Sequence, residues 1–320
     1  MGTNRLTTWW KHVKQAVGPQ GEGVDLLVAC SRYALRIPIN QIGAEQSSEH
    51  AIIAEGDGLY YGWAKSDASQ IWLAARRALV SNECPTESER GVILELTQTA
   101  SNPAVWGERP LRDLHGTAYY RNRLWMTCSY DDAVAIYNPA TQEWLWWQPL
   151  PRAEHAGPDQ FHFNTLMMEQ DRVWVLAHRR GPSWLMAFPI EAALSGQTVE
   201  PLRSVELGQQ AHNIWRQDNG ELCTCSSIEG ALLGEHGWRL NTGGFPRGIA
   251  RTAHGWVVGI SELKERSARD FSDARLKFYD PGWQQVEELS LPRVGMVLDL
   301  MLVPRTTVLP CVGKLPAAAD

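Results

Sequence analysis

The chain has 320 residues, of which 44% are hydrophobic and 21% charged, a globular composition that excludes bulk disorder. Its 30 basic and 36 acidic side chains give a net charge of −6, which argues against a nucleic-acid-binding or anionic-membrane-binding surface. No uncharged apolar run approaches the roughly 18 residues of a membrane-spanning helix. Tryptophan, with 15 residues, outnumbers tyrosine and phenylalanine, and aromatic residues favour strands.

The first 23 residues differ from the rest of the chain. Leu6–Val17 has helical periodicity, so residues 1–23 are expected to form an N-terminal helical extension, and they lack the apolar region of a signal peptide.

Six cysteines are scattered along the chain. Cys223 and Cys225 lack the C-x2-C spacing of a zinc knuckle and are expected to be buried small side chains. A cytoplasmic location with reduced thiols is therefore the expectation.

A unit of two strands joined by a polar turn recurs along the chain. Each copy begins with a His or an Arg, followed by about eight residues of strand, a polar turn and a second strand. Two further strand-like runs follow the unit, most clearly at 133–151 and 274–292. The copies begin at His50, His115, His162, His212 and Arg247. Four strands in about 50 residues, repeated, predict the blades of a β-propeller.

The two chain ends supply the strands of one more blade. Val297–Val303 resembles a first strand, Val24–Ser31 a second and Tyr33–Asn40 a third. A blade made from both ends would close the ring and leave no exposed sheet edge there. We therefore predict an all-β, six-bladed β-propeller over residues 24–304, followed by a C-terminal tail over residues 305–320. A β-sandwich, or two unrelated β domains, is the alternative fold.

Four short stretches carry a resemblance to a known group of proteins. They are DLHGTAYY (Asp113–Tyr120), DQFHFNTL (Asp159–Leu166), QAHNI (Gln210–Ile214) and GGFPRGIA (Gly243–Ala250). On these stretches the chain resembles bacterial six-bladed propellers of uncharacterised function, over about Val24–Pro304. The resemblance implies the fold and no assigned reaction. Neither the Gly-His and Trp-Asp signature of WD repeats nor the paired-glycine signature of kelch repeats recurs along the sequence.

The start of each innermost strand of a propeller lies at one mouth of its central channel. The recurring His and Arg residues are therefore expected to converge there. Imidazole is the commonest transition-metal ligand, so we expect a divalent Fe, Mn, Zn or Cu ion. Asp113 and Asp159 are expected to orient two of the imidazoles as hydrogen-bond acceptors, and Asp299 reaches the sixth position only if the register shifts. The predicted metal ligands are His50, His115, His162 and His212.

Arg247 replaces histidine at the fifth position. A guanidinium beside a metal ion is repulsive unless an anion lies between them, so Arg247 predicts an anionic substrate. The loops after the second strands are expected to open on the same mouth, although a solvated charged loop is the alternative for Arg179 and Arg180. The predicted substrate-binding residues are Arg247, Arg179, Arg180, Ser129, Tyr130 and Ser226.

Two classes of function fit these observations. The first is an enzyme acting on a small polar or anionic molecule as a lyase, oxygenase, hydrolase or group-transfer catalyst, with Arg247, His115 and His162 as catalytic residues. It uses a metal, or else one histidine as a general base or nucleophile. The second is a binding or scaffold module in which the histidines only join the blades. No G-x-S-x-G, H-E-x-x-H, P-loop or dinucleotide motif is present, and no nucleic-acid or membrane partner is expected.

Overall fold

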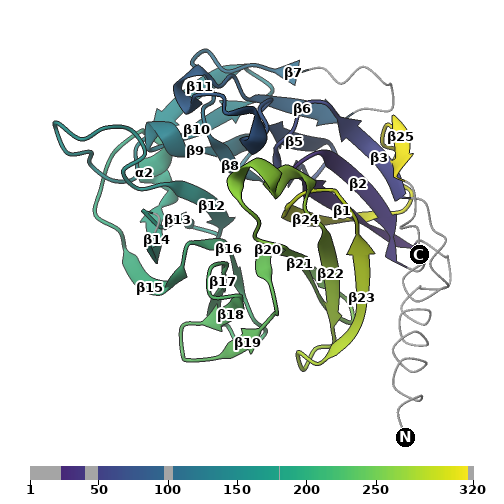
Figure 1. The fold of residues 1–320 in the computed structure, drawn as a ribbon. Helices are drawn as coiled ribbons and strands as arrows, with labels where there is room; N and C mark the ends of the chain where they lie inside the picture. Colours follow the sequence, from purple (N-terminus) through teal and green to yellow (C-terminus); the bar gives the residue numbers. More distant parts are fainter. Residues whose placement is uncertain (1–22, 40–49, 97–103, 180, 316–320) are drawn as a thin grey trace, which may run out of the picture.

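The protein is a ring of six antiparallel sheets around a central channel. The structure is a computed structural model that describes residues 23–39, 50–96, 104–179 and 181–315. Each sheet is one blade, and the innermost strands contact one another around the axis (Figure 1). This is the six-bladed β-propeller expected from the sequence. Among the described residues, no helix is long and apolar enough to cross a membrane.

The blades are numbered here in chain order, with the innermost strand given first. Blade 1 contains β24 (Val297–Pro304), β1 (Val24–Cys30), β2 (Tyr33–Pro38), β3 (His50–Glu55) and β25 (Gly313–Leu315). Blade 2 contains β4 (Tyr60–Lys65), β5 (Ile71–Ala75), β6 (Val92–Leu96) and β7 (Ala104–Val105). Blade 3 contains β8 (Leu114–Tyr120), β9 (Arg123–Cys128), β10 (Ala133–Asn138) and β11 (Glu143–Trp147).

The other three blades have the same order of strands. Blade 4 contains β12 (Phe163–Met168), β13 (Arg172–Ala177), β14 (Pro182–Pro189) and β15 (Arg203–Gln209). Blade 5 contains β16 (Ala211–Arg216), β17 (Leu222–Ser226), β18 (Ala231–Gly234) and β19 (Arg239–Asn241). Blade 6 contains β20 (Phe245–Thr252), β21 (Gly255–Ser261), β22 (Ala274–Tyr279) and β23 (Gln285–Leu291). Short helices lie in the connections: α2 (Ile190–Leu194), η2 (Val80–Asn82), η3 (Thr86–Ser88), η4 (Ser129–Asp131) and η5 (Arg266–Phe271).

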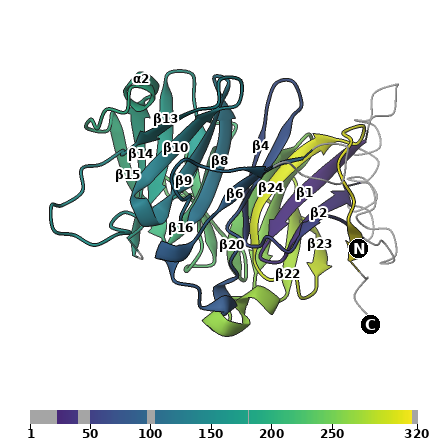
Figure 2. The same cartoon turned by 90° about the horizontal axis from the view of Figure 1, so that it is seen from above.

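Blade 1 joins the two ends of the chain, as predicted. The innermost strand β24 pairs antiparallel with β1, and β2 lies on the other side of β1 (Figure 2). Beyond the strands, Ser31 donates a backbone hydrogen bond to Met296, and Asp25 accepts from both Arg36 and Arg305. Backbone and side-chain hydrogen bonds therefore hold in one sheet two strands whose paired residues run from Val24 with Pro304 to Cys30 with Val297.

Two predicted boundaries are wrong. His50 begins β3, the fourth strand of blade 1, and the innermost strand of blade 2 is β4. The segment after β3 therefore joins two blades, although its strand–turn–strand pattern resembles a hairpin within one blade. Part of the expected tail is also structured, because β25 pairs with β3 and gives blade 1 a fifth strand. The helix expected at Leu6–Val17 lies outside the described residues.

The hydrophobic core lies between the blades. Each pair of neighbouring blades encloses its own cluster of buried side chains, for example Trp125 of blade 3 with Phe188 of blade 4. Trp147 on the outermost strand of blade 3 is fully buried and packs edge-on against Phe188 of blade 4. Cys223 and Cys225 are buried on β17 and form no disulfide. Burial between sheets fixes each blade relative to the next.

Every innermost strand carries a bulge or register shift near its start. The irregularities fall in β4, β8, β12, β16 and β20, and in the pairing of β24 with β1. A bulge bends a strand and changes the direction of a side chain. It also leaves backbone N–H groups free to bond side chains of the neighbouring blade. Gly248 N donates a hydrogen bond to Asn213 Oδ1 at 2.7 Å, and Trp63 N donates one to Asp299 Oδ2 at 3.0 Å. These bonds connect the innermost strands to one another.

Deleting residues 297–320 is expected to abolish the cooperative unfolding transition of the whole protein. The deletion removes β24, so β1 loses its partner and the ring opens between blades 6 and 2. Calorimetry or circular dichroism on heating measures the transition. A matched deletion of residues 309–320 removes β25 alone and should keep the transition at a lower temperature. A 1–296 fragment that melts like the full chain would contradict ring closure.

Candidate functional site

Seven side chains form a closed circle at the channel mouth, which we call the axial ring. They come from the starts of innermost strands, from the residue before β12 and from the end of β13. Neighbouring members are linked by ring contacts or by the Arg247 guanidinium. In order around the axis, the members are Tyr61, His115, His162, His178, His212, Phe245 and Arg247.

The contacts within the axial ring are close. The centroids of the His115 and His162 rings lie 4.9 Å apart, those of His162 and His178 4.3 Å, and those of His178 and His212 5.7 Å. Arg247 closes the circle, because its Cζ lies 4.9 Å from the centroid of Phe245 and its Nη1 lies 3.5 Å from the Tyr61 hydroxyl. Four imidazoles and one guanidinium thus meet at one end of the channel.

The tautomer of His115 follows from its hydrogen bonds. Its Nδ1 lies 2.9 Å from the Asp113 carbonyl oxygen and 3.0 Å from Ser129 Oγ. Ser129 donates its own proton to the Phe163 carbonyl of the next blade, so both neighbours of Nδ1 are acceptors. Nδ1 therefore carries the proton, and Nε2 has a free lone pair.

His212 repeats this arrangement in blade 5. Its Nδ1 lies 2.8 Å from Ser227 Oγ, and Ser227 donates to the Pro246 carbonyl of blade 6. His212 Nε2 is buried without a hydrogen-bond partner among the described residues. In both blades a serine joins the histidine to the next blade and fixes the lone pair on Nε2.

Burial keeps three of these histidines neutral. It lowers the pKa of His115 to about 3 and that of His178 to about 2, and it holds the pKa of His212 well below its usual 6.5. After burial, the neighbouring His162 ring lowers the pKa of His178 most, and the Arg247 guanidinium lowers that of His212 most. Neutral imidazoles are the form that binds a metal or accepts a proton.

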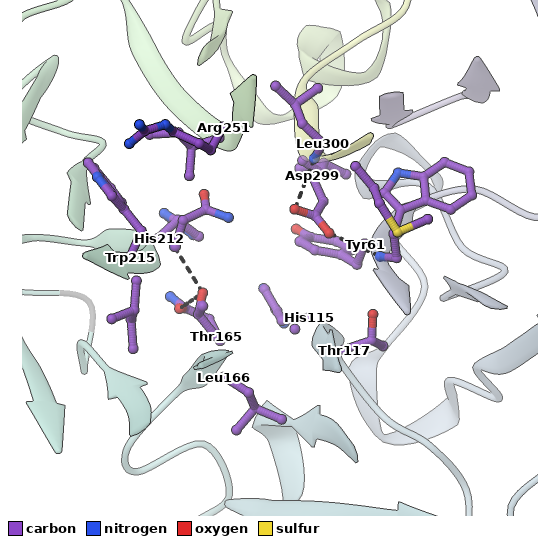
Figure 3. Close-up of a pocket in the computed structure, with 18 of the residues that line it drawn as sticks. Tyr61, His115, Thr117, Thr165, Leu166, His212, Trp215, Arg251, Asp299 and Leu300 are labelled. Carbon is purple, nitrogen blue, oxygen red and sulfur yellow. Dashed lines mark hydrogen bonds between the residues drawn. The ribbon is translucent and has the colours of Figure 1, made fainter. Parts of the chain in front are cut away.

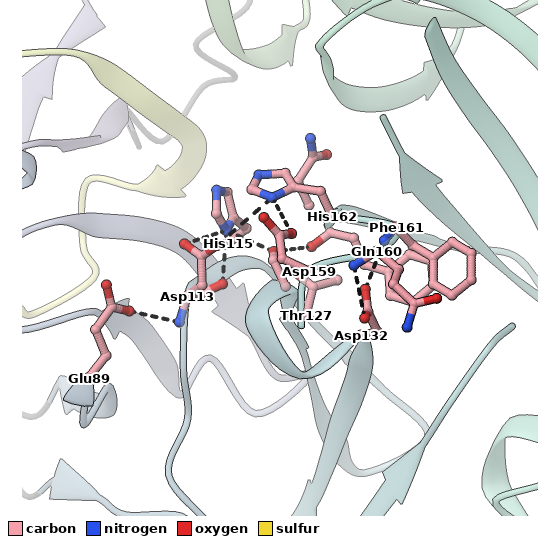
Figure 4. Close-up of polar contacts among 12 residues, drawn as sticks. Glu89, Asp113, His115, Thr127, Asp132, Asp159, Gln160, Phe161 and His162 are labelled. Atoms are coloured by element: carbon pink, nitrogen blue, oxygen red, sulfur yellow. Dashed lines mark hydrogen bonds and ion pairs between the residues drawn. The ribbon is translucent and has the colours of Figure 1, made fainter. Parts of the chain in front are cut away.

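Two aspartates adjoin the histidines, as the sequence indicated (Figure 4). Asp159 Oδ1 accepts from His162 Nδ1 at 2.7 Å, whereas Asp113 orients His115 through its backbone carbonyl. Asp113, Asp159 and His162 all have left-handed backbone, with φ of 52°, 60° and 50°. Such conformations cost about 1–3 kcal/mol when unfavourable and concentrate at functional sites.

Asp113, His115 and His162 form a group that could hold a metal ion. One donor atom from each lies within 4.8 Å of the others. Arg76 binds the Asp113 carboxylate at 2.6 Å and also pairs with Glu89, which accepts from the Asp113 backbone N–H. The Asp113 carboxylate is thereby held in place from behind by a buried ion-pair network.

Arg247 is a buried cation without a carboxylate partner. Only 8% of the residue is exposed, and it forms no ion pair with any described residue. Its Nε has no hydrogen-bond partner in the described part of the chain, and burial lowers its pKa. Arg247 forms no ion pair with Asp113 or Asp159, so neither carboxylate accounts for the burial of its charge. An uncompensated buried charge is costly, and a bound anion would offset that cost.

The axial ring borders a cavity of about 430 Å³, the mouth cavity, which Tyr61, His115, His162, His178 and Arg247 help to line. Of the predicted substrate-binding residues, Arg247 and Tyr130 line this cavity. Ser129 lies behind His115, and Ser226 instead bonds Glu229 and the Gln209 backbone.

Other predicted residues lie elsewhere. Arg179 is exposed over the Phe161 ring and does not line the mouth cavity, and Arg180 lies outside the described residues. His50, predicted as a metal ligand, lies on the outer strand β3, away from the axis. The prediction aligned the repeated units on their first histidine, and this misplaced His50 because its strand belongs to the preceding blade.

Tyr61 and His178 were absent from the predicted site residues. Tyr61 takes in blade 2 the place that was expected for His50. A second pattern marks it in the sequence: Tyr61, His115 and Arg247 are each followed by glycine. A Cβ at the second of these glycines, Gly116, would lie 2.8 Å from Thr165 Cα, so the next blade requires glycine there. His178 ends a second strand, where the repeat has serine in other blades.

Comparisons with known proteins support the fold alone. No family model matches this chain, and no curated protein matches it. It is similar to a protein of unknown function from Bacteroides caccae, at 12% identity and a TM-score of 0.60 over 88% of this chain and 99% of that one. A nidogen/laminin complex structure gives 10% identity and a TM-score of 0.60, covering 88% and 98%. A streptogramin B lyase reaches only 0.46 at 12% identity, covering 76% and 86%, too distant to carry an argument.

Replacing Ser227 with alanine is expected to destabilise the protein by about 1–3 kcal/mol, the range for an unpaired buried polar group. The change leaves His212 Nδ1 and the Pro246 carbonyl without the hydroxyl that both contact. Urea denaturation measures the free energy of unfolding. Ser204→Ala on the exposed face of β15 is the control and should change it by less than about 0.5 kcal/mol. Equal effects of the two changes would contradict a joining role for Ser227.

Proposed function

We propose that this protein is an enzyme that binds a small anionic molecule in the mouth cavity and acts on it at the histidines of the axial ring. The observation that supports this most is Arg247, a buried guanidinium that forms no ion pair with a carboxylate of the described residues. A carboxylate, phosphate or sulfate group matches the planar donors of a guanidinium. Bound there, the anion would share the mouth cavity with Tyr61 and His178, which also line it.

A divalent transition metal at Asp113, His115 and His162 is the first form of this proposal. Two imidazoles and one carboxylate are a donor set that suits Fe, Mn, Zn or Cu. Such an ion would polarise the substrate or activate water. The residues of the chain would orient these ligands: Arg76 holds Asp113, and Asp159 holds His162. His212 and His50, the other two predicted ligands, lie outside this group.

Acid–base chemistry without a metal is the second form, and a specific contact favours it. The Nδ1 atoms of His115 and His162 lie 3.6 and 3.9 Å from the Asp113 carboxylate, but both are already hydrogen-bonded to other acceptors. The Asp159–His162 pair has the geometry of a general base, with Nδ1 bonded to the carboxylate and Nε2 left to accept a proton. Arg247 would then stabilise negative charge that develops on the substrate.

Arg247→Met is expected to weaken anion binding by about 2–5 kcal/mol, because the anion loses its charged partner within a buried site. Calorimetric titration with phosphorylated, sulfated and carboxylated small molecules measures the affinity. Arg179→Met removes the same charge from an exposed position and should leave affinity nearly unchanged. Anion binding that is equal in both variants would contradict the proposal, and an anion that binds without being converted would support a binding module instead.

The two chemical forms differ in metal content. If a metal acts, elemental analysis of the purified protein should find Fe, Mn, Zn or Cu in stoichiometric amount, and the His115→Ala/His162→Ala variant should lose it. His236→Ala removes an exposed histidine and serves as the control. A metal-free protein that still converts its substrate, and whose rate falls in His162→Ala, would establish the acid–base form. Metal retained in the double variant would place the ion elsewhere.

A further inference from the structure

A second cavity of about 440 Å³ lies on the other side of the axial ring, and we call it the distal cavity. Tyr61 and His115 line both cavities, so this pair separates them. Inner-strand residues beyond the bulges form its walls, among them Asp299 of β24 next to Tyr61 (Figure 3). The proposed function assigns no role to this cavity.

Asp299 is a carboxylate without a cation. Its Oδ2 accepts the Trp63 N–H at 3.0 Å and its Oδ1 accepts the Leu300 N–H at 2.9 Å. No described Lys, Arg or His forms an ion pair with it. Burial raises its pKa to about 7, more than the two backbone bonds lower it. Asp299 thus has the same lack of a counter-ion in the distal cavity that Arg247 has in the mouth cavity.

The other charges of the distal cavity are already neutralised. Arg251 binds Asp218 through both terminal nitrogens, and Arg216 binds Glu169 at 2.6 Å. The two histidines that line the cavity, His115 and His212, are neutral because burial lowers their pKa. One carboxyl group therefore remains without a charged partner among the described residues that line the distal cavity, and a cation bound beside it would favour its ionised form.

Aromatic and aliphatic side chains line much of the same cavity. Trp63, Trp215 and Trp256 line the cavity, and the rings of Trp215 and Trp256 lie 6.4 Å apart at 52°. A hard divalent cation prefers several charged oxygen ligands. Asp299 is the one unpaired carboxylate among the described residues of this lining, and the amide oxygens of Asn164 and Asn213 already accept hydrogen bonds. An alkylammonium needs one carboxylate together with aromatic faces and apolar surface.

We infer that the distal cavity binds the ammonium group of a small organic amine, with Asp299 as its counter-ion and the indole rings as its walls. The inference is independent of Arg247, since it concerns a ligand without any negative group. A molecule with an acidic group at one end and an amine at the other would use both cavities, and the two inferences together would then describe one elongated substrate.

Calorimetric titration with n-butylammonium tests the inference, and 1-butanol serves as the uncharged probe of similar shape. The native protein should bind the ammonium at least tenfold more tightly than the alcohol. Asp299→Asn should weaken binding of n-butylammonium by about tenfold to a hundredfold, the loss expected for one charge-assisted hydrogen bond. Glu206→Gln makes the same change of charge on the exposed face of β15 and should leave the affinity within about twofold.

Three outcomes would overturn the inference: no binding of n-butylammonium to the native protein, equal binding of the ammonium and the alcohol, or unchanged binding in a folded Asp299→Asn variant. The comparison of the two probes uses the native protein, so it decides the question even if Asp299→Asn fails to fold. Arg247→Met should bind n-butylammonium as the native protein does. If this variant loses anion binding but keeps n-butylammonium binding, the two proposals are independent, and either can fail without the other.

Discussion

The close approach of six innermost strands to one axis is the constraint from which the site follows. Where these strands meet, one blade's backbone leaves little room for a side chain on the next: a Cβ at Gly62 would lie 3.1 Å from the His115 carbonyl oxygen, and one at Gly248 would lie 3.2 Å from Asp299 Cα. Glycine and a bulge resolve the crowding. Because the bulge redirects the preceding residue, Tyr61 and Arg247 reach the channel.

The same crowding separates two charges that would otherwise neutralise each other. Arg247 and Asp299 belong to neighbouring innermost strands, and the residue after Arg247 packs against Asp299. They line opposite cavities, however, and form no ion pair. Each charge is desolvated, and each would be stabilised by a ligand group of opposite sign. The folded protein thus keeps two unfavourable charges that complementary ligand groups could relieve, a common cost of a binding site.

Much of the fold could be predicted because propeller blades repeat a local pattern that short-range strand signals reveal. Closure by β24 and β1 was also predictable, since each chain end alone would be an incomplete sheet. His50 was misplaced because a strand–turn–strand pattern reads the same within a blade and across the junction of two blades. Arg76 and Glu89 could not be predicted, since they reach Asp113 from connections outside the repeat. The sequence predicted that Asp299 reaches the channel only if the strand register shifts. The pairing of β24 with β1 does contain a register shift, next to Asp299.

The shared construction of blade 1 also sets the order in which the chain can complete its fold. During synthesis, β1, β2 and β3 emerge before the other blades, but the innermost strand of their own sheet is made after all strands of blades 2 to 6. Blades 2 to 6 can form local hairpins as they leave the ribosome, whereas the ring can close only once residues 297–304 are free. Until then the apolar faces of blades 1 and 6 lack their final packing partner. A nascent chain stalled before β24 would therefore be an open arc, dependent on chaperones to stay unaggregated.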